Sequence, residues 1–232
     1  MSNKNLSILF TGQGSQFPNM GVDLANKHSW VKERYQQSSD ILGYDVFKKQ
    51  EDPDLLNLTE YSQPSIFIYT SILIDFVRDK IKSSGSNIIL AGHSLGEYSA
   101  LVASDSIDIA DALNLVYQRG LLMEKSEKGI MCAILGLDEQ IINKICSTIS
   151  DKDSCSVSSA NLNAPKQIVI AGNEKGVIEA INNLNVKIPI IVRLEGTNSK
   201  EASKLLKDSS LEFIVANNLA DGAEKAVMEA KR

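Results

Sequence analysis

The chain has 232 residues, of which 43% are hydrophobic and 23% are charged, and this is the composition of an ordinary folded globular protein. Its formal net charge of -5 argues against a surface that tracks nucleic-acid phosphates, because such a surface needs clustered lysine and arginine. The first apolar run is too short for a signal peptide and no stretch approaches a membrane span, so we expect a cytoplasmic protein.

The first half of the chain has the pattern of an α/β protein with a parallel sheet. Apolar runs alternate with segments of helical spacing, and glycine-rich turns follow the strands. The predicted elements are a strand at 7–11, a glycine-rich turn at 12–16, helical spacing over 21–42, a buried helix with Pro64 near its first turn, a strand at 87–91, a tight turn at 92–96 and helices at 97–103 and 109–125.

The second half changes to the order strand, helix, strand, strand, helix, strand, which is the ferredoxin-like pattern. Its elements are predicted at 130–137, 138–150, 155–161, 167–171, 174–184 and 188–194, followed by a helix at 199–207, a strand at 211–216 and a helix at 219–230.

The chain contains three cysteines, Cys132, Cys146 and Cys155. Their number is odd, no two of them form a CxxC spacing, and no histidine stands at ligand spacing from them. We therefore predict neither a disulfide framework nor a zinc site, and expect three buried or half-buried reduced thiols.

One short motif carries chemistry. Residues 92–96, Gly-His-Ser-Leu-Gly, fit the pattern G-x-S-x-G between an apolar strand and a helix. This arrangement is a nucleophile elbow, which places Ser94 on a sharp turn with backbone N–H groups and the helix dipole nearby. The alternative is that Ser94 is an ordinary N-cap of a buried helix. The flanking pattern favours the nucleophile.

Ser94 stands in one of four motifs that follow one another along residues 6–184. The motifs are Gly12-Gln13-Gly14-Ser15-Gln16, Gly92-His93-Ser94-Leu95-Gly96-Glu97-Tyr98, Gln118-Arg119-Gly120 with Met123, and Asn161-Leu162-Asn163-Ala164-Pro165. They resemble the motifs of malonyl-CoA:acyl-carrier-protein transacylases and of the acyltransferase domains of polyketide synthases. In that family a serine takes an acyl group from coenzyme A and passes it to the phosphopantetheine thiol of acyl carrier protein.

The resemblance implies a role for several side chains and backbone groups. Ser94 would be the nucleophile, and the N–H groups of Gln13 and Leu95 would form the oxyanion hole. Arg119 would hold the free carboxylate of the malonyl group in a bidentate fork, although on spacing alone a surface ion pair would be favoured. Asn163, or Asn161, would line the pocket, and an ordinary turn before a proline is an equal alternative.

The resemblance also implies a histidine, after the ferredoxin-like subdomain, that takes the serine proton as general base. The chain has two histidines, His28 and His93, and neither matches that position. His93 adjoins the nucleophile on the incoming strand, so we expect its ring to project away from the Ser94 hydroxyl. His28 is interpreted as a partly exposed helix residue near Trp30.

From about residue 185 the sequence resembles a second family. Residues 187–198 and the elements after them are similar to the carboxyl-terminal end of the β subunit of ADP-forming succinyl-CoA synthetase. The simplest interpretation is a truncated transacylase fused to a truncated ligase tail, and no ligase function is inferred. The strand at 188–194 would complete the ferredoxin-like sheet, although Pro189 favours an edge position.

Together these patterns predict an α/β fold with a parallel-sheet, hydrolase-like acyltransferase core over 1–128, a ferredoxin-like subdomain over 129–195 and a ligase-like α/β tail over 196–232. The implied function is malonyl transfer from malonyl-CoA to acyl carrier protein in fatty acid biosynthesis, through a seryl ester. No cofactor, metal, nucleic acid or membrane is implied, and the missing histidine would impair the reaction. The alternative is a non-catalytic module that binds coenzyme A thioesters or acyl carrier protein.

Overall fold

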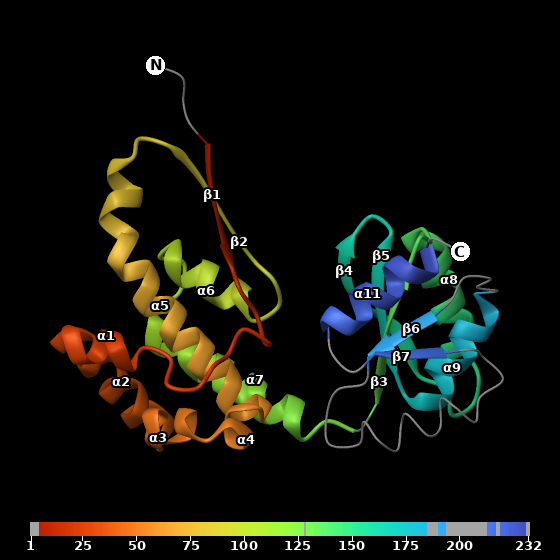
Figure 1. The fold of residues 1–232 in the computed structure, drawn as a ribbon, viewed down its shortest axis with the longest axis horizontal. Coiled ribbons are helices and arrows are strands. Elements are labelled where there is room, and N and C mark those ends of the chain that lie inside the picture. The colour runs from red at the N-terminus through yellow and green to blue at the C-terminus, as the bar shows by residue number, and fades with distance from the viewer. Residues whose placement is uncertain (1–4, 128, 185–189, 194–212, 217–218, 231–232) are drawn as a thin grey trace. The chain divides into compact units, whose positions relative to one another are not determined.

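The computed structural model describes residues 5–127, 129–184, 190–193, 213–216 and 219–230. The chain divides into two compact units, residues 1–126 and 127–232, and each is described by itself. Both units combine helices with strands, as the ribbon in Figure 1 shows, so the predicted α/β class is confirmed. None of the described helices has the length and apolar character needed to cross a membrane.

The first unit contains a two-stranded parallel sheet, as predicted. Strand β1, Asn5–Phe10, pairs along its whole length with β2, Asn87–Gly92. Every second residue of β1 is less exposed than its neighbours, and the last of these, Phe10, is buried. Leu9, on the opposite face, is 76% exposed. Helix α6, Gly96–Ala103, packs against both strands, so one face of this sheet is covered within the unit.

Helices form most of the first unit, and a hydrophobic core lies between them. Val31, Phe67, Ile72 and Val116 are all completely buried in this core. Each such side chain contributes about 1.5–3 kcal/mol of burial free energy. The other helices are α1 (Val22–Lys27), α2 (Ser29–Leu42), α3 (Val46–Glu51), α4 (Pro53–Leu56), α5 (Thr59–Ser83) and α7 (Ile109–Glu124).

Two helices begin or end differently from the sequence-based expectation. The helical spacing over 21–42 belongs to α1 and α2, which are separated at His28, where the backbone is extended. Helix α5 begins at Thr59, so Pro64 lies inside it rather than near its first turn. The buried surface of α5 extends on both sides of Pro64, and this packing outweighs the hydrogen bond that a proline cannot donate.

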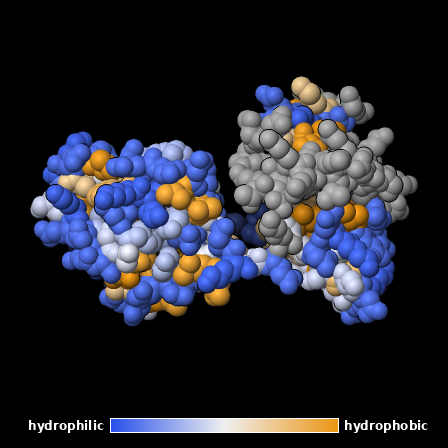
Figure 2. All heavy atoms as spheres, turned by 90° about the horizontal axis from the view of Figure 1, so that it is seen from below, coloured by the Kyte–Doolittle hydropathy of each residue, from blue (hydrophilic) through white to orange (hydrophobic). Residues whose placement is uncertain are grey.

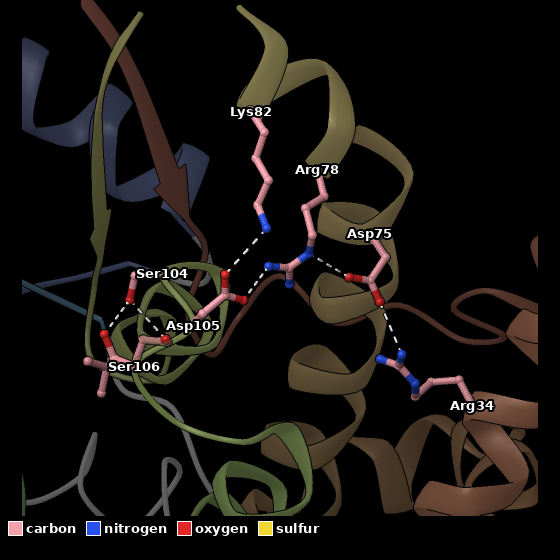
Figure 3. A network of polar contacts seen from close by, with 8 residues as sticks. Arg34, Asp75, Arg78, Lys82, Ser104, Asp105 and Ser106 are labelled. Atoms are coloured by element: carbon pink, nitrogen blue, oxygen red, sulfur yellow. Dashed lines mark hydrogen bonds and ion pairs between the residues drawn. The ribbon is translucent and has the colours of Figure 1, made fainter. Parts of the chain in front are cut away.

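A chain of charged side chains joins α2, α5 and the turn before α7. Figure 3 shows Asp75 between Arg34 and Arg78, with ion pairs of 3.1 Å on each side. Arg78 also donates to Asp105 at 2.7 Å, and Lys82 lies 3.5 Å from the same carboxylate. The side chains of Arg34, Asp75 and Arg78 are each less than a third exposed, so solvent screens these pairs less than ordinary surface pairs.

Asp75→Asn is expected to lower the free energy of unfolding by about 1–2 kcal/mol, because it removes the negative charge and replaces one of the two oxygens that accept from partly buried guanidinium groups with an NH2 donor. Asp79→Asn is the matched control, since Asp79 is an exposed residue on the same helix. Urea unfolding followed by circular dichroism measures both. Equal losses in the two variants would contradict a structural role for the network.

The second unit has a three-stranded antiparallel sheet in the order β3-β5-β4. Two helices pack on it, and a second hydrophobic core lies between helices and sheet. This arrangement matches the first five elements of the predicted ferredoxin-like pattern. They are β3 (Ile130–Leu135), α8 (Glu139–Ser150), β4 (Val157–Ala164), β5 (Gln167–Gly172) and α9 (Glu174–Asn183).

The sixth element of that pattern differs from the expectation. Strand β6, Ile190–Arg193, pairs in parallel with β7, Phe213–Ala216, and not with the three-stranded sheet. Helix α11, Leu219–Ala230, packs against both strands, so they share a covering helix of their own. The predicted helix at 199–207 lies outside the described residues, and the predicted boundary at 195 stays a prediction.

The three cysteines are free and buried, as predicted. Burial raises the pKa of the Cys132 thiol to about 11, because a low-dielectric interior disfavours the thiolate.

At pH 8 this pKa reduces the thiolate fraction of Cys132 about a hundredfold relative to an ordinary thiol. We expect iodoacetamide to alkylate Cys132 rapidly in urea and at least about tenfold more slowly in the folded chain, as peptide mass spectrometry would measure. Equal rates in the two conditions would show that the second core is open to solvent.

Candidate active site

Ser94 occupies a strained turn between β2 and α6. Its φ angle is 53°, in the left-handed region that residues with a side chain rarely adopt. Such a conformation costs on the order of 1–3 kcal/mol and persists only where the surroundings enforce it. Ser94 itself is half-buried, while the next residue, Leu95, is completely buried. The elbow predicted from residues 92–96 is therefore present in the structure.

The two glycines of this motif are required by packing. A Cβ atom on Gly92 would overlap the backbone of Gly96, and one on Gly96 would overlap the carbonyl oxygen of Phe10. A third glycine, Gly12, approaches from the glycine-rich turn, where an added Cβ would lie 2.8 Å from the carbonyl oxygen of His93. The turn after β1 therefore lies directly against the turn that carries Ser94.

Arg119 comes from α7, and Gly120 allows that helix to approach closely. A Cβ atom on Gly120 would lie 3.0 Å from the Cα of Glu60 and the carbonyl oxygen of Thr59 at the start of α5. The backbones of the two helices therefore nearly touch at this point. The Gln-Arg-Gly motif thus places Arg119 beside the first turns of α5.

Ser94 and Arg119 are in direct contact. The Nη2 of Arg119 donates to the Oγ of Ser94 at 2.6 Å. The Nη1 of the same guanidinium donates to the Oε1 of Gln63 at 2.5 Å. Arg119 is half-buried, and in the described part of the chain no carboxylate pairs with it. A cation next to a serine hydroxyl, with neutral partners, is suited to bind a carboxylate of a ligand.

Gln13 is connected to this contact through Gln63. The Nε2 of Gln63 donates to the Oε1 of Gln13 at 3.3 Å and to the Sδ of Met123 at 3.2 Å. The Nε2 of Gln13 donates in turn to the Oγ1 of Thr59 at 3.4 Å. The structure thus brings the glycine-rich turn, α5 and α7 together around Ser94.

Gln63 belongs to none of the four sequence motifs. It is completely buried on α5, in a stretch of buried residues that includes Ser62 and Ser65. A glutamine between serines and next to a proline gives no apolar pattern that would indicate burial, and its burial becomes evident only when α7 is in place.

Four candidates remain. Asn161 and Asn163 belong to β4 of the second unit, where register shifts against β5 flank them. They are strand residues rather than turn residues, and their place in a pocket stays a prediction. His28 is half-buried at the junction of α1 and α2, and its ring packs edge-on against Phe76 at 5.0 Å. His93 is exposed in the turn before Ser94, and the direction of its ring stays a prediction.

Comparisons with known proteins identify the family of the chain. The family model of the acyl transferase domain matches residues 8–206. The chain belongs to the acyl transferase domain family.

Curated and solved members of this family are similar over most of the chain. A malonyl CoA-acyl carrier protein transacylase of Synechocystis sp. is 38% identical over 189 residues, 81% of this chain and 61% of that protein. The crystal structure of MCAT from Streptococcus pneumoniae has a TM-score of 0.67 at 39% identity, covering 78% of this chain and 59% of that one. The chain thus spans about six tenths of the length of these relatives.

A second solved structure contains a carrier protein. It is a type II PKS acyl-carrier protein in complex with its malonyl-transacylase, and it matches with a TM-score of 0.64 at 31% identity. The match covers 93% of this chain and 74% of that one. The acyl transferase match also continues past residue 185, to 206, so the family extends beyond the point where the sequence suggests a change.

In this acyl transferase domain, Gly96→Ala is expected to lower the free energy of unfolding by at least about 2 kcal/mol, because the added methyl group forces the elbow away from β1. Gly222→Ala is the control, since a Cβ there meets Ala216 at an ordinary 3.4 Å and a helical alanine is favoured over glycine. Thermal unfolding of both variants measures the difference. An unchanged Tm for Gly96→Ala would show that the elbow does not need this glycine.

Proposed function

We propose that the chain is a malonyl-CoA:acyl-carrier-protein transacylase in which Ser94 accepts the malonyl group. The observation that carries the proposal is the 2.6 Å contact between the Arg119 guanidinium and the Ser94 hydroxyl, in the absence of a carboxylate partner among the described residues. A malonyl thioester has a free carboxylate close to its reactive carbonyl. A cation beside the nucleophile therefore distinguishes it from an acetyl thioester.

The proposed reaction consists of two transfers of the malonyl group, first to the Oγ of Ser94 and then from it. The Oγ of Ser94 attacks the thioester carbonyl carbon, the C–S bond breaks, and the coenzyme A thiol leaves with the serine proton. The phosphopantetheine thiol of acyl carrier protein then attacks the seryl ester, and the serine recovers its proton. In each transfer the N–H groups of Gln13 and Leu95 would stabilise the negative carbonyl oxygen.

We further propose that transfer by these 232 residues is slow. The resemblance implies a histidine base, and the two histidines present are His28 and His93. Ring packing on Phe76 holds His28 at the junction of α1 and α2, and the Ser94 Oγ accepts a hydrogen bond from Arg119. A guanidinium only donates hydrogen bonds, so it cannot remove the serine proton. Removing the base of a nucleophile typically costs several orders of magnitude in rate.

A non-catalytic module is the second candidate function. The complex of a type II PKS acyl-carrier protein with its malonyl-transacylase supports carrier protein as a partner. The Arg119 cation, which pairs with no carboxylate of the described residues, supports malonyl-CoA as a ligand. In this case the chain binds either partner without forming an ester. No cofactor is proposed for either function.

Three finer assignments remain proposals. Asn163 would line the substrate pocket. The tail from about 185 would derive from the carboxyl end of a succinyl-CoA synthetase β subunit, against which the family match to residue 206 weighs. The location would be cytoplasmic.

Incubation with labelled malonyl-CoA tests the main proposal. We expect a slow mass gain of one malonyl group on the Ser94 peptide, no gain in Ser94→Ala, and acceleration by added imidazole, which supplies the base. Ser106→Ala, an exposed serine outside the elbow, should behave like the unchanged chain. Binding of malonyl-CoA without ester formation selects the second function, and the absence of both binding and ester contradicts both. Fast transfer without imidazole would show that the chain has another base.

A further inference from the structure

We propose that Gln63 is a positioning residue that orients the Arg119 guanidinium for the substrate carboxylate. This inference rests on the proposed function of Arg119. It adds a residue that no sequence motif assigned to the site.

The burial of Gln63 requires that its amide be satisfied. The residue is completely buried, and an unpaired buried amide costs about 1–3 kcal/mol. Its partners are the guanidinium of Arg119, the amide oxygen of Gln13 and the sulfur of Met123. All three belong to segments that surround Ser94. Gln63 therefore connects α7 with the glycine-rich turn rather than filling core volume alone.

The direction of this hydrogen-bond chain is set by the arginine. A guanidinium has donors and no acceptor, so Gln63 must turn its Oε1 towards Arg119. Its Nε2 then faces the Oε1 of Gln13, whose own Nε2 faces the hydroxyl of Thr59. Each amide orientation follows from the one before it. This series of hydrogen bonds therefore fixes the guanidinium at one end and the glycine-rich turn at the other.

A neutral anchor leaves the cation available. Gln63 holds Nη1 at 2.5 Å, and the Ser94 hydroxyl takes Nη2 at 2.6 Å. A substrate carboxylate can replace the hydroxyl at Nη2 while Nη1 stays anchored. A carboxylate at position 63 would instead pair with Arg119 permanently, and it would compete with a charged ligand but not with a neutral one.

Two variants separate orientation from packing. Gln63→Glu keeps size and acceptor but adds a competing charge. Gln63→Met keeps approximate volume but removes the hydrogen bonds to Arg119, Gln13 and Met123. Gln50→Met is the matched control, because Gln50 is also completely buried but lies on α3, outside this hydrogen-bond chain. Circular dichroism establishes that each variant folds, and calorimetric titration of the full chain with malonyl-CoA and acetyl-CoA gives the two affinities.

We expect the unchanged chain to bind malonyl-CoA more tightly than acetyl-CoA. Gln63→Glu should weaken malonyl-CoA binding by at least about tenfold, the effect of one charge-assisted hydrogen bond, and acetyl-CoA binding by less than about threefold. Gln63→Met should lower the same ratio by a smaller factor. Gln50→Met should keep the ratio, even if its Tm falls.

The outcomes distinguish the two proposals. If the unchanged chain does not prefer malonyl-CoA, the proposed role of Arg119 fails and the role of Gln63 fails with it. If that preference exists and both Gln63 variants retain it, the positioning role alone is overturned. If one variant does not fold, the other still decides, because either one removes the neutral acceptor from Arg119.

Discussion

The first unit is organised around the contact between a guanidinium and a serine hydroxyl. The contact requires Ser94 in a left-handed conformation at the end of β2 and Arg119 on a helix that approaches α5 without side-chain bulk. Glycines meet both requirements, at 92 and 96 in the elbow and at 120 on α7. Local strain at Ser94 is therefore maintained by close backbone packing on several sides, which is the usual condition for a strained residue to persist.

The same contact defines what the site can do chemically. A cation next to a hydroxyl favours the alkoxide, since an opposite charge stabilises the ionised form. A guanidinium cannot accept a proton, so it stabilises the anion without generating it. Binding of a carboxylate and removal of the serine proton are thus separate tasks. The geometry around Arg119 is suited to the first, and the second requires a base.

The sequence predicted the parts of this site that depend on local pattern. The elbow, the strand before it and the helix with Arg119 follow from apolar runs and glycine spacing, and the structure contains all of them. Gln63 was missed because its importance comes from a contact between residues far apart in sequence. Pro64 suggested a helix start by its residue type, although tertiary packing continues the helix through it. The pairing of β6 with β7 was missed for a similar reason, because an apolar run indicates a strand but not its neighbour.

Neutral amides next to the Arg119 guanidinium meet an electrostatic requirement. A half-buried guanidinium needs hydrogen-bond acceptors, and a carboxylate would satisfy it at the expense of ligand binding. Gln63 provides a neutral acceptor oxygen for Arg119. Its Nε2 donates to Gln13, whose own Nε2 donates to Thr59. The first carboxylate reached along this route is Glu124, which accepts the backbone N–H of Thr59 at 3.2 Å. The negative charge therefore stands at the far end of this series of hydrogen bonds, whereas the partners of the guanidinium at the Ser94 end are neutral.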